Sequence, residues 1–549
     1  MVEHGFLRRN FGHGVLFGVW ACVTFVLALF LLGPFLSIVY VTTGDSGGLW
    51  GHLLDTVFPR YVTNTLVLMF GVSVLSLIFG LSSAWIVARI RFPGRRILEW
   101  MLILPATVPA YLIAYTYTDL LEFAGPVQGF LRDLFGWQTS KDYWFPEIRS
   151  MGGAILVMSA VLYPYIYLLA RTAFRITPAA LHEVARLHNR SSSISLDLAL
   201  ARPAIVAGLA LVLMEVISDF GTVEYFAVQT LTLGIFNVWL GMNNLTAAAQ
   251  IAGMSFIFIF ALLFIEWKAR SQQRFFDSGQ RSNQIERTRV SRWKMVLCIS
   301  ACVVPILLGF IVPVGVLLKF VIDGFSVTDV NSLLSSALNS LSLSFMAAIT
   351  VMLISLIMVV VVTHQNRRFL KVFTAISAMG YAFPGVVLAI GVVSFAGMLD
   401  AGSAAVINQV LGFKSSGILI GSFGLLVFAY VVRFQAIGYG SITAGINRLS
   451  PNLISANHSL GKIFTNSIFV LSPVLLKKSL LTGGLLVFVD AMKELPITLI
   501  LRPFNFETLS TYVYQFAQDE LLEDASLAGL AIVVVGLGPV LWMNASQRR

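Results

Sequence analysis

Apolar segments of about twenty residues recur along the whole chain, and this pattern constrains the fold more than any other feature. A helix needs roughly 20 mostly apolar residues to cross a bilayer, and inside the bilayer its backbone polar groups must be satisfied by one another. Only 12% of the residues are charged, whereas soluble globular proteins carry about 25%. We therefore predict an all-α polytopic membrane protein. Its twelve predicted spans are centred near residues 27, 76, 109, 161, 214, 259, 307, 350, 383, 426, 490 and 534.

Four of these spans, near residues 109, 214, 383 and 490, are interrupted by Gly, Pro or charged residues. Their ends are therefore predicted only to within several residues. Pro and Gly in membrane helices often mark places where the backbone breaks and is satisfied by neighbouring groups.

The positive charges are distributed unevenly between the predicted loops. With the N-terminus inside, 29 of the 37 basic residues fall in inside segments, among them Arg433, and seven fall outside. Basic residues accumulate in cytoplasmic loops, so both termini are predicted to be cytoplasmic. The net charge of +10 is thus explained by topology and does not indicate a nucleic-acid partner.

The second half of the chain repeats the first at a constant offset. The matched positions include Asn64 with Asn339, Pro109 with Pro384, and Gly208 with Gly483. The repeat predicts two tandem six-helix halves, residues 1–270 and 293–549, joined by a polar cytoplasmic linker at 271–292. Six spans per half give both halves the same orientation, related by a pseudo-twofold axis along the membrane normal.

Carboxylates in the apolar spans follow the same repeat. Glu215 matches Asp490, and Asp219 matches Glu494. In each half the two residues are four apart, so they lie on one face of a helix. Charged residues are costly in a bilayer and usually face the interior of the bundle. We therefore expect both pairs, together with nearby Glu224, to face the interface between the halves.

The chain has no phosphate-binding loop of the Walker A type, since its only Gly-Lys dipeptide, Gly461–Lys462, is followed by Ile463. All seven His lie in predicted loops or the N-terminal tail, so no His or Cys cluster in the spans suggests an enzyme, a cofactor or a soft-metal site. If the chain is a transporter, it therefore either uses ATP that a partner hydrolyses or couples to an ion gradient.

Three stretches carry a resemblance to a known family: Pro105–Trp137, Glu215–Gly241 and Asp490–Glu520. The last of them contains DAMKELPITLILRPFNF. Over nearly its whole length the chain resembles the fused, two-half permeases of bacterial ferric-iron ABC importers. This class also includes thiamine, sulfate and polyamine permeases. The resemblance implies a place in the bacterial inner membrane, a cytoplasmic ATPase dimer, and an extracytoplasmic iron-binding protein that delivers Fe³⁺.

The resemblance also implies that two cytoplasmic loops dock the ATPase subunits through a pattern of Glu-Ala-Ala, three residues and Gly. Both loops depart from this pattern, so we expect the two ATPase subunits to be held unequally. The matching positions are Glu183, Ala185 and Asn189 in the first loop, and Ser455, Ala456 and Gly461 in the second.

Two interpretations of the membrane carboxylates stay open. Fe³⁺ is a hard cation that prefers oxygen ligands, so the carboxylates would line its path without forming a tight metal site. Alternatively they are structural, pairing with Lys493 or binding backbone groups freed at helix breaks near Gly221 and Pro496, with Arg502 securing the segment that follows. The candidate path residues are Glu215, Asp219, Glu224, Asp490 and Glu494.

Alternatives to an iron importer also stay open. A permease of the same class would carry thiamine or another small solute. A secondary transporter of 6+6 parallel architecture would instead use the membrane carboxylates to carry protons.

Overall fold

The structure is a computed structural model of the chain. It describes residues 2–176, 182, 193–271, 287–324, 330–365, 367–411, 417–450, 453, 457 and 459–546.

The described residues confirm an all-α polytopic protein. They contain ten helices long and apolar enough to cross a membrane, or up to twelve if each of two bent helix pairs is one span. Each predicted span centre lies in one of these segments or within a few residues of it. The span predicted near 383 begins only at Gly385, because residues 378–384 form a short turn that ends at Pro384.

Helix packing divides the chain into two compact units, each made of segments distant in sequence. Unit 1 is Met1–Asp45 with Asn331–Thr511, and unit 2 is Ser46–Val330 with Tyr512–Arg549. Each unit therefore combines segments from both predicted halves. The division into halves 1–270 and 293–549 stays a prediction about the repeat.

Unit 1 begins with the long N-terminal helix α1 and continues from α15 to the start of α24. Its elements are α1 (Val2–Thr42), α15 (Val330–Gln365), α16 (Arg368–Ser377), η4 (Gly380–Ala382), α17 (Gly385–Leu411), α18 (Phe423–Ile446), α20 (Phe464–Asn466), η5 (Ser467–Leu471), α21 (Ser472–Leu475), α22 (Lys477–Met492) and α23 (Pro496–Leu501). Helix α24 (Leu509–Gln518) starts in unit 1, and its residues from Tyr512 onward belong to unit 2.

Unit 2 contains the remaining helices and one two-residue parallel pairing of β1 with β2. Its elements are α2 (Leu49–Thr56), α3 (Phe58–Arg89), β1 (Ile90–Arg91), α4 (Arg95–Met101), η1 (Leu104–Thr107), α5 (Ala110–Leu121), α6 (Pro126–Phe135), α7 (Met151–Ile176), α9 (Ser193–Ser218), α10 (Gly221–Tyr225), α11 (Leu231–Phe236), η2 (Asn237–Gly241), α12 (Leu245–Ser271), β2 (Thr288–Arg289), α13 (Arg292–Ile306), η3 (Leu307–Ile311), α14 (Val312–Gly324) and α25 (Leu522–Ser546).

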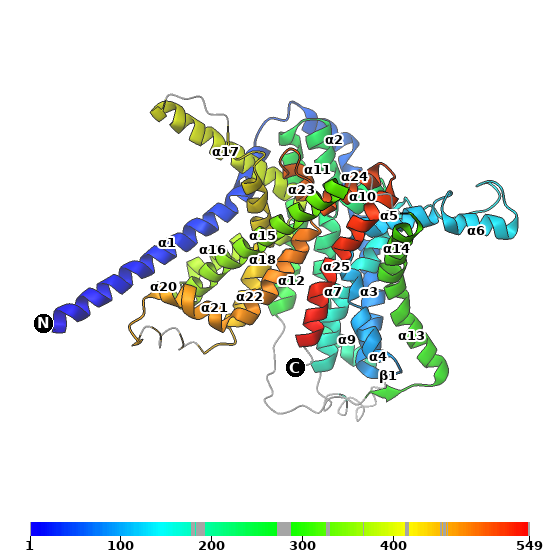
Figure 1. Cartoon of the computed structure of the whole chain (residues 1–549), viewed down its shortest axis with the longest axis horizontal. Coiled ribbons are helices and arrows are strands. Elements are labelled where there is room, and N and C mark those ends of the chain that lie inside the picture. Colours follow the sequence, from blue (N-terminus) through cyan, green and yellow to red (C-terminus); the bar gives the residue numbers. More distant parts are fainter. Residues whose placement is uncertain are drawn as a thin grey trace. The chain divides into compact units, whose positions relative to one another are not determined.

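In unit 1, α1 packs against helices from the second half of the sequence. It runs alongside α16 and α17 (Figure 1), and Ser37 Oγ donates a hydrogen bond of 2.7 Å to Gly391 O. Phe25 stacks on Phe373, with ring centroids 4.9 Å apart. The first span is therefore built into the structure of the second predicted half.

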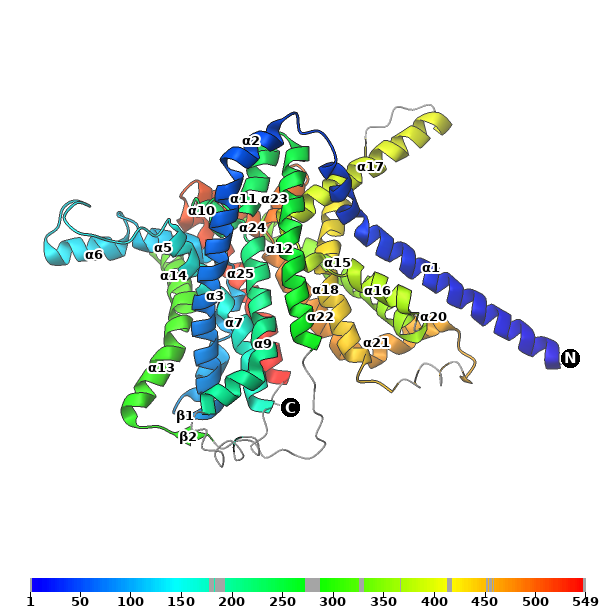
Figure 2. The ribbon, with the colours of Figure 1, turned by 180° about the vertical axis from the view of Figure 1, so that it is seen from behind.

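In unit 2, α3, α7 and α9 form the most closely packed group, and α13 lies along α3 (Figure 2). Helix α25, the last of the chain, packs against α14, α5 and η1. Tyr117 of α5 donates a hydrogen bond of 2.9 Å to Leu308 O. The first predicted half is thus completed by the first and last spans of the second half.

Small residues allow the helices to approach closely, as is common in membrane proteins. A Cβ atom on Gly208 of α9 would lie 3.0 Å from Ile166 Cα of α7. In the other unit, a Cβ on Gly483 of α22 would lie 2.8 Å from Ser441 Oγ of α18. The repeat offset relates Gly208 to Gly483, and it also relates their partners, Ile166 and Ser441. The same crossing therefore occurs once in each unit.

A second set of contacts also occurs in both units. Asn64 Nδ2 donates to Gln229 O at 2.9 Å, and Asn339 Nδ2 donates to Glu507 O at 3.0 Å. The next residue in each span, Thr65 or Ser340, accepts a hydrogen bond from the backbone of Leu231 or Leu509, respectively. Leu231 and Leu509 are slightly further apart in sequence than Asp219 and Glu494 are. The second half therefore has a short insertion between Glu494 and Leu509.

The two bent pairs have different origins. At Pro109 the helices on either side diverge by 94°, since Pro cannot donate to a preceding turn and restricts the residue before it. The other pair bends by 81° at Leu476, between α21 and α22. This second bend was not expected from the sequence: Leu476 is neither Pro nor Gly, although Pro473 lies three residues before it, at the start of α21.

Candidate functional site

The candidate path residues lie where a long helix ends and a short one begins. In unit 2, Glu215 is in the last turn of α9, Asp219 directly follows α9, and Glu224 is in α10. In unit 1, Asp490 is in the last turn of α22. Glu494 lies between α22 and α23. The helix breaks expected near Gly221 and Pro496 are thus present, and the carboxylates lie at these breaks in both units.

Asp219 accepts hydrogen bonds from the backbone N–H groups at the start of the short helix α10. Its Oδ1 accepts hydrogen bonds from Thr222 N at 3.1 Å and Val223 N at 3.2 Å. Its Oδ2 accepts from Thr222 Oγ1 at 3.0 Å. A helix start has unpaired backbone N–H groups, and a carboxylate suits them because they form the positive end of the helix dipole. Among the described residues, no Lys or Arg forms an ion pair with Asp219.

Glu494, the counterpart of Asp219, has a buried cation beside it. Its Oε2 lies 3.0 Å from Arg433 Nε, and the side chains of Glu494 and Arg433 are 7% and 8% exposed. Arg433 Nη1 also donates to Phe383 O at 3.1 Å, so this arginine links α18 to the breaks before α17 and α23. The position of the first half that matches Arg433 is Met158. The two carboxylates therefore have different electrostatic surroundings.

The placement of Arg433 corrects an expectation. The charge count assigns it to an inside segment, but it lies in the candidate span Phe423–Ile446 and is 7% exposed. Hydropathy misses it because a single charge hardly changes the mean of a long apolar window. The sequence does contain a signal for a buried arginine: Arg433 directly follows the apolar run FGLLVFAYVV, and the matching position of the first half is not basic.

Further ion pairs hold the break in unit 1. Lys493 Nζ lies 2.9 Å from Asp490 Oδ1, and Arg502 pairs with Glu507 beyond α23. These pairs agree with the structural interpretation for Asp490, and for Arg502 as a residue that secures the segment after the break.

In unit 2, Glu224 has a neutral partner. Tyr514 Oη of α24 lies 2.8 Å and 2.7 Å from its two carboxylate oxygens, and its hydroxyl donates to them. Phe220, next to Asp219, contacts the same tyrosine ring, with centroids 6.2 Å apart. Asp219 and Glu224 are thus bound by hydroxyl and backbone N–H groups.

No three His, Cys, Asp or Glu side chains of the described residues are placed so that together they could hold a metal ion. Instead, the carboxylates at the breaks each have their own hydroxyl, backbone N–H or cationic partners.

Of the six candidate coupling residues, five lie outside the described residues: Glu183, Ala185, Asn189, Ser455 and Ala456. Gly461 is described. It is exposed and has a φ of +76°, a left-handed conformation that favours glycine in the turn before α20.

Next to the first loop, sequence reasoning missed a buried ionic cluster, which we call the loop latch: Trp85, Arg89, His182 and Asp197. Asp197 is fully buried, and its Oδ1 lies 2.5 Å from Arg89 Nη2 and 3.0 Å from His182 Nε2. Its Oδ2 accepts from Arg89 Nε at 2.9 Å and from Trp85 Nε1 at 3.1 Å. Because His182 directly precedes Glu183, the latch joins the start of the coupling segment to α3 and α9.

The second half has no Asp, Glu, Lys or Arg at the matching positions, which are Val360, His364, Asn457 and Ser472. There Asn457 Nδ2 donates to Ser467 Oγ at 2.8 Å, and Ser472 Oγ donates to Ser467 O at 2.6 Å. A lone Asp in the basic segment Arg171–Arg202 is the sequence signal for the latch, but its partner Arg89 lies 108 positions earlier.

Comparison with known proteins reveals relatives that cover almost the whole chain. The chain is 24% identical over 494 residues to the Fe(3+)-transport system permease protein FbpB 2 of Haemophilus influenzae, covering 88% of this chain and 89% of that protein. It is homologous to ferric transport permeases. A ferric transport system permease protein FbpB of Actinobacillus pleuropneumoniae is 21% identical over 512 residues, 88% of this chain and 71% of its own.

Shorter relatives match about two-fifths of the chain. A probable molybdenum ABC transporter permease protein of Haloferax volcanii is 27% identical over 232 residues, 41% of this chain and 80% of its own. No family model matches the chain. The relatives are named as transport permease components and not as enzymes, and together with the apolar helices they place the chain among multi-pass inner-membrane proteins.

Proposed function

We propose that the chain is the membrane permease of an ATP-driven importer and that it carries Fe³⁺ into the cytoplasm. The observation that carries this proposal is the similarity to ferric transport permeases over 88% of the chain. An importer of this kind takes Fe³⁺ from an extracytoplasmic binding protein. A pair of ATPase subunits on the cytoplasmic side, where both termini of the chain also lie, supplies the energy, so the chain itself needs no enzymatic activity.

We further propose that the carboxylates of the first half contact the passing cation. Asp219 and Glu224 accept hydrogen bonds from neutral donors, so their negative charge is available to a passing cation, and Glu215 adds a third carboxylate one turn before Asp219.

The second half makes a different contribution. Asp490 and Glu494 share their charge with Lys493 and Arg433. These pairs fix the helix break and limit the net negative charge, since an ion held too tightly does not leave.

The test is uptake of radiolabelled Fe³⁺ into proteoliposomes that contain the chain and its ATPase, with ATP inside and the loaded binding protein outside. The variant is Asp219→Asn/Glu224→Gln, which removes two charges but keeps the size of both side chains. The matched control is Asp55→Asn, an exposed carboxylate of α2.

We expect uptake by the variant to fall about tenfold or more, equivalent to about 1.4 kcal/mol on the transport barrier, while the control stays at the wild-type rate. Normal uptake by the variant would make these carboxylates structural. Uptake that persists without ATP but stops when the proton gradient is collapsed would establish the proton-coupled alternative.

A second candidate substrate has one observation in its favour. Relatives that match about two-fifths of the chain are named for molybdenum and sulfate transport. If the complex hydrolyses ATP in response to a binding protein loaded with an oxyanion or another small solute, and not with Fe³⁺, the class of transporter stands and the substrate is different.

A further inference from the structure

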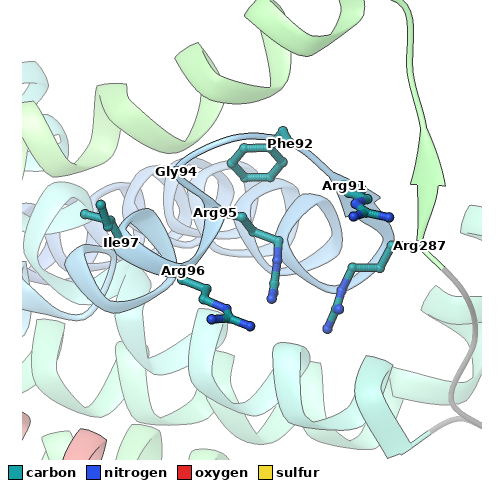
Figure 3. A pocket seen from close by; sticks show the side chains of 7 residues that line it. All are labelled: Arg91, Phe92, Gly94, Arg95, Arg96, Ile97 and Arg287. Atoms are coloured by element: carbon teal, nitrogen blue, oxygen red, sulfur yellow. The ribbon is translucent and has the colours of Figure 1, made fainter.

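A cavity of about 800 Å³ lies in unit 2 where α3 ends and α13 begins. Four arginines line it together with Phe92, Gly94 and Ile97 (Figure 3). We call it the arginine pocket. Its arginines are Arg91, Arg95, Arg96 and Arg287.

The arginine pocket combines two segments that are distant in sequence. β1 pairs with β2 in parallel, with Ile90 opposite Thr288 and Arg91 opposite Arg289. This pairing brings Arg287 to the turn between α3 and α4. In Figure 3 the side chains of Arg95, Arg96 and Arg287 point into the same space.

Among the described residues around the pocket, positive charge exceeds negative charge. Glu99 is the neighbouring carboxylate, and it already pairs with Arg95 at 2.9 Å, Arg171 at 3.1 Å and Arg175 at 2.5 Å. Among the described residues, no carboxylate pairs with Arg91, Arg96 or Arg287.

The environment of Arg287 reflects this excess. Although its side chain is exposed, partial desolvation and the nearby charges of Arg95 and Arg175 lower the pKa of its guanidinium, against the opposing effect of Glu99. An anion in the pocket would relieve this repulsion.

The pocket lies at a membrane boundary. α3 is a span that ends at Arg89, and the span of α13 starts at Arg292. Trp residues concentrate at the level of lipid headgroups, and Trp293 at the start of α13 is 72% exposed. Ile97 of α4 is 63% exposed and Leu297 of α13 is 55% exposed, and these two helices pack together. Apolar side chains at the rim thus accompany arginines inside, on the side that charge asymmetry predicts to be cytoplasmic.

We propose that the arginine pocket binds the phosphate-bearing headgroup of an anionic phospholipid of the inner leaflet. Arg96 and Arg287 contact the phosphate, because they have no carboxylate partner among the described residues, and Ile97 with the exposed face of α13 contacts the acyl chains. Basic pockets beside membrane helices on the cytoplasmic side suit such headgroups, and a guanidinium can bind two phosphate oxygens at once.

The experiment is native mass spectrometry of the purified, delipidated chain titrated with phosphatidylglycerol. Phosphatidylcholine and inorganic phosphate are titrated separately. The test variant is Arg96→Gln/Arg287→Gln, in which both replaced side chains are exposed, so the packed core stays unchanged. The control variant is Arg367→Gln/Arg368→Gln, which removes the same charge at exposed positions beginning α16, the counterpart of α4 in the repeat.

The wild type and the control variant should bind phosphatidylglycerol alike, and the pocket variant should bind it about 30-fold more weakly if each arginine contributes about 1 kcal/mol. Phosphatidylcholine and inorganic phosphate should bind all three weakly. Equal affinity of the two variants for phosphatidylglycerol would overturn the proposal. Inorganic phosphate that binds as tightly as the lipid would also overturn it, because the ligand of the pocket would then be a soluble phosphate and not a lipid headgroup. Loss of ATPase-subunit binding by the pocket variant with unchanged lipid affinity would assign the pocket to a protein partner.

Discussion

Replacing Asp197 with Asn tests whether the loop latch holds the first coupling segment. The change keeps the size of the side chain but removes the charge that neutralises Arg89, whose side chain is 7% exposed, while that of Asp197 is 0% exposed. Asp197 also accepts from Trp85 and lies within hydrogen-bond distance of His182. Removing one partner of a buried ion pair typically costs about 3 to 5 kcal/mol, because the other charge is left uncompensated.

We expect Asp197→Asn to lower the apparent melting temperature of the purified chain. Stability can be followed with a thiol-reactive fluorophore in a Cys22→Ala/Cys298→Ala background, which removes the exposed and the half-buried thiol, since Cys302 is buried and becomes reactive when unit 2 opens. The ATPase of the reconstituted complex should also respond less to loaded binding protein, because the residue before Glu183 has lost its attachment to α3 and α9.

The double variant Arg89→Met/Asp197→Leu separates stability from coupling. Replacing both members of a buried ion pair by apolar residues of similar size is often neutral, so we expect stability to recover. Coupling should stay low, since His182 has lost both of its charged neighbours in the latch. A single variant as stable as the wild type, or a double variant that restores coupling, would refute the proposal that the latch positions the loop.

The remaining predictions concern the helix breaks and the packing of unit 2. Arg433→Met should destabilise unit 1 by about 3 to 5 kcal/mol because Glu494 is left buried without its cation, and adding Glu494→Gln should restore most of the loss when melting is followed by the circular dichroism of the helices. Tyr514→Phe removes the hydroxyl donor to Glu224 and should cost about 1.5 kcal/mol, the lower end for a hydrogen bond to a charged group because this carboxylate is half-buried; a change below about 0.5 kcal/mol, the size seen for surface substitutions, would contradict the contact. Gly309→Ala places a methyl group against the backbone of α7 and should cost about 1 to 3 kcal/mol by overpacking, whereas unchanged melting would show that η3 can move away.

The sequence was sufficient for features that depend on local composition or on the repeat. The spans follow from apolar runs, and the breaks beside Asp219 and Glu494 follow from charge, Gly and Pro within those runs. The repeat offset predicted matching positions, and Gly208 and Gly483 do make the same helix crossing in their units. These are properties that a short window of sequence, or its comparison with a second window, already contains.

Features that depend on a distant partner were not predictable in this way. The position of Arg433 became clear only with Glu494 beside it, and Arg89 with Asp197. The bend at Leu476 lies three residues after Pro473 and coincides with no Pro or Gly, so a local rule did not give its position. The exchange of spans between the compact units is likewise a matter of tertiary packing, because a constant repeat offset does not specify which copy a helix joins.

The packing of α1 on α17 has a consequence for how the chain is made. Ser37 bonds to a residue 354 positions later, and a ribosome adding about 5 to 20 residues per second needs roughly 20 to 70 s to reach it. During that interval the first span waits in the bilayer without the helices that will cover it. A chain interrupted in its middle would therefore separate α1 from α16 and α17, the helices that it packs against. Of the segments of unit 1, α1 is made first and waits longest for its partners.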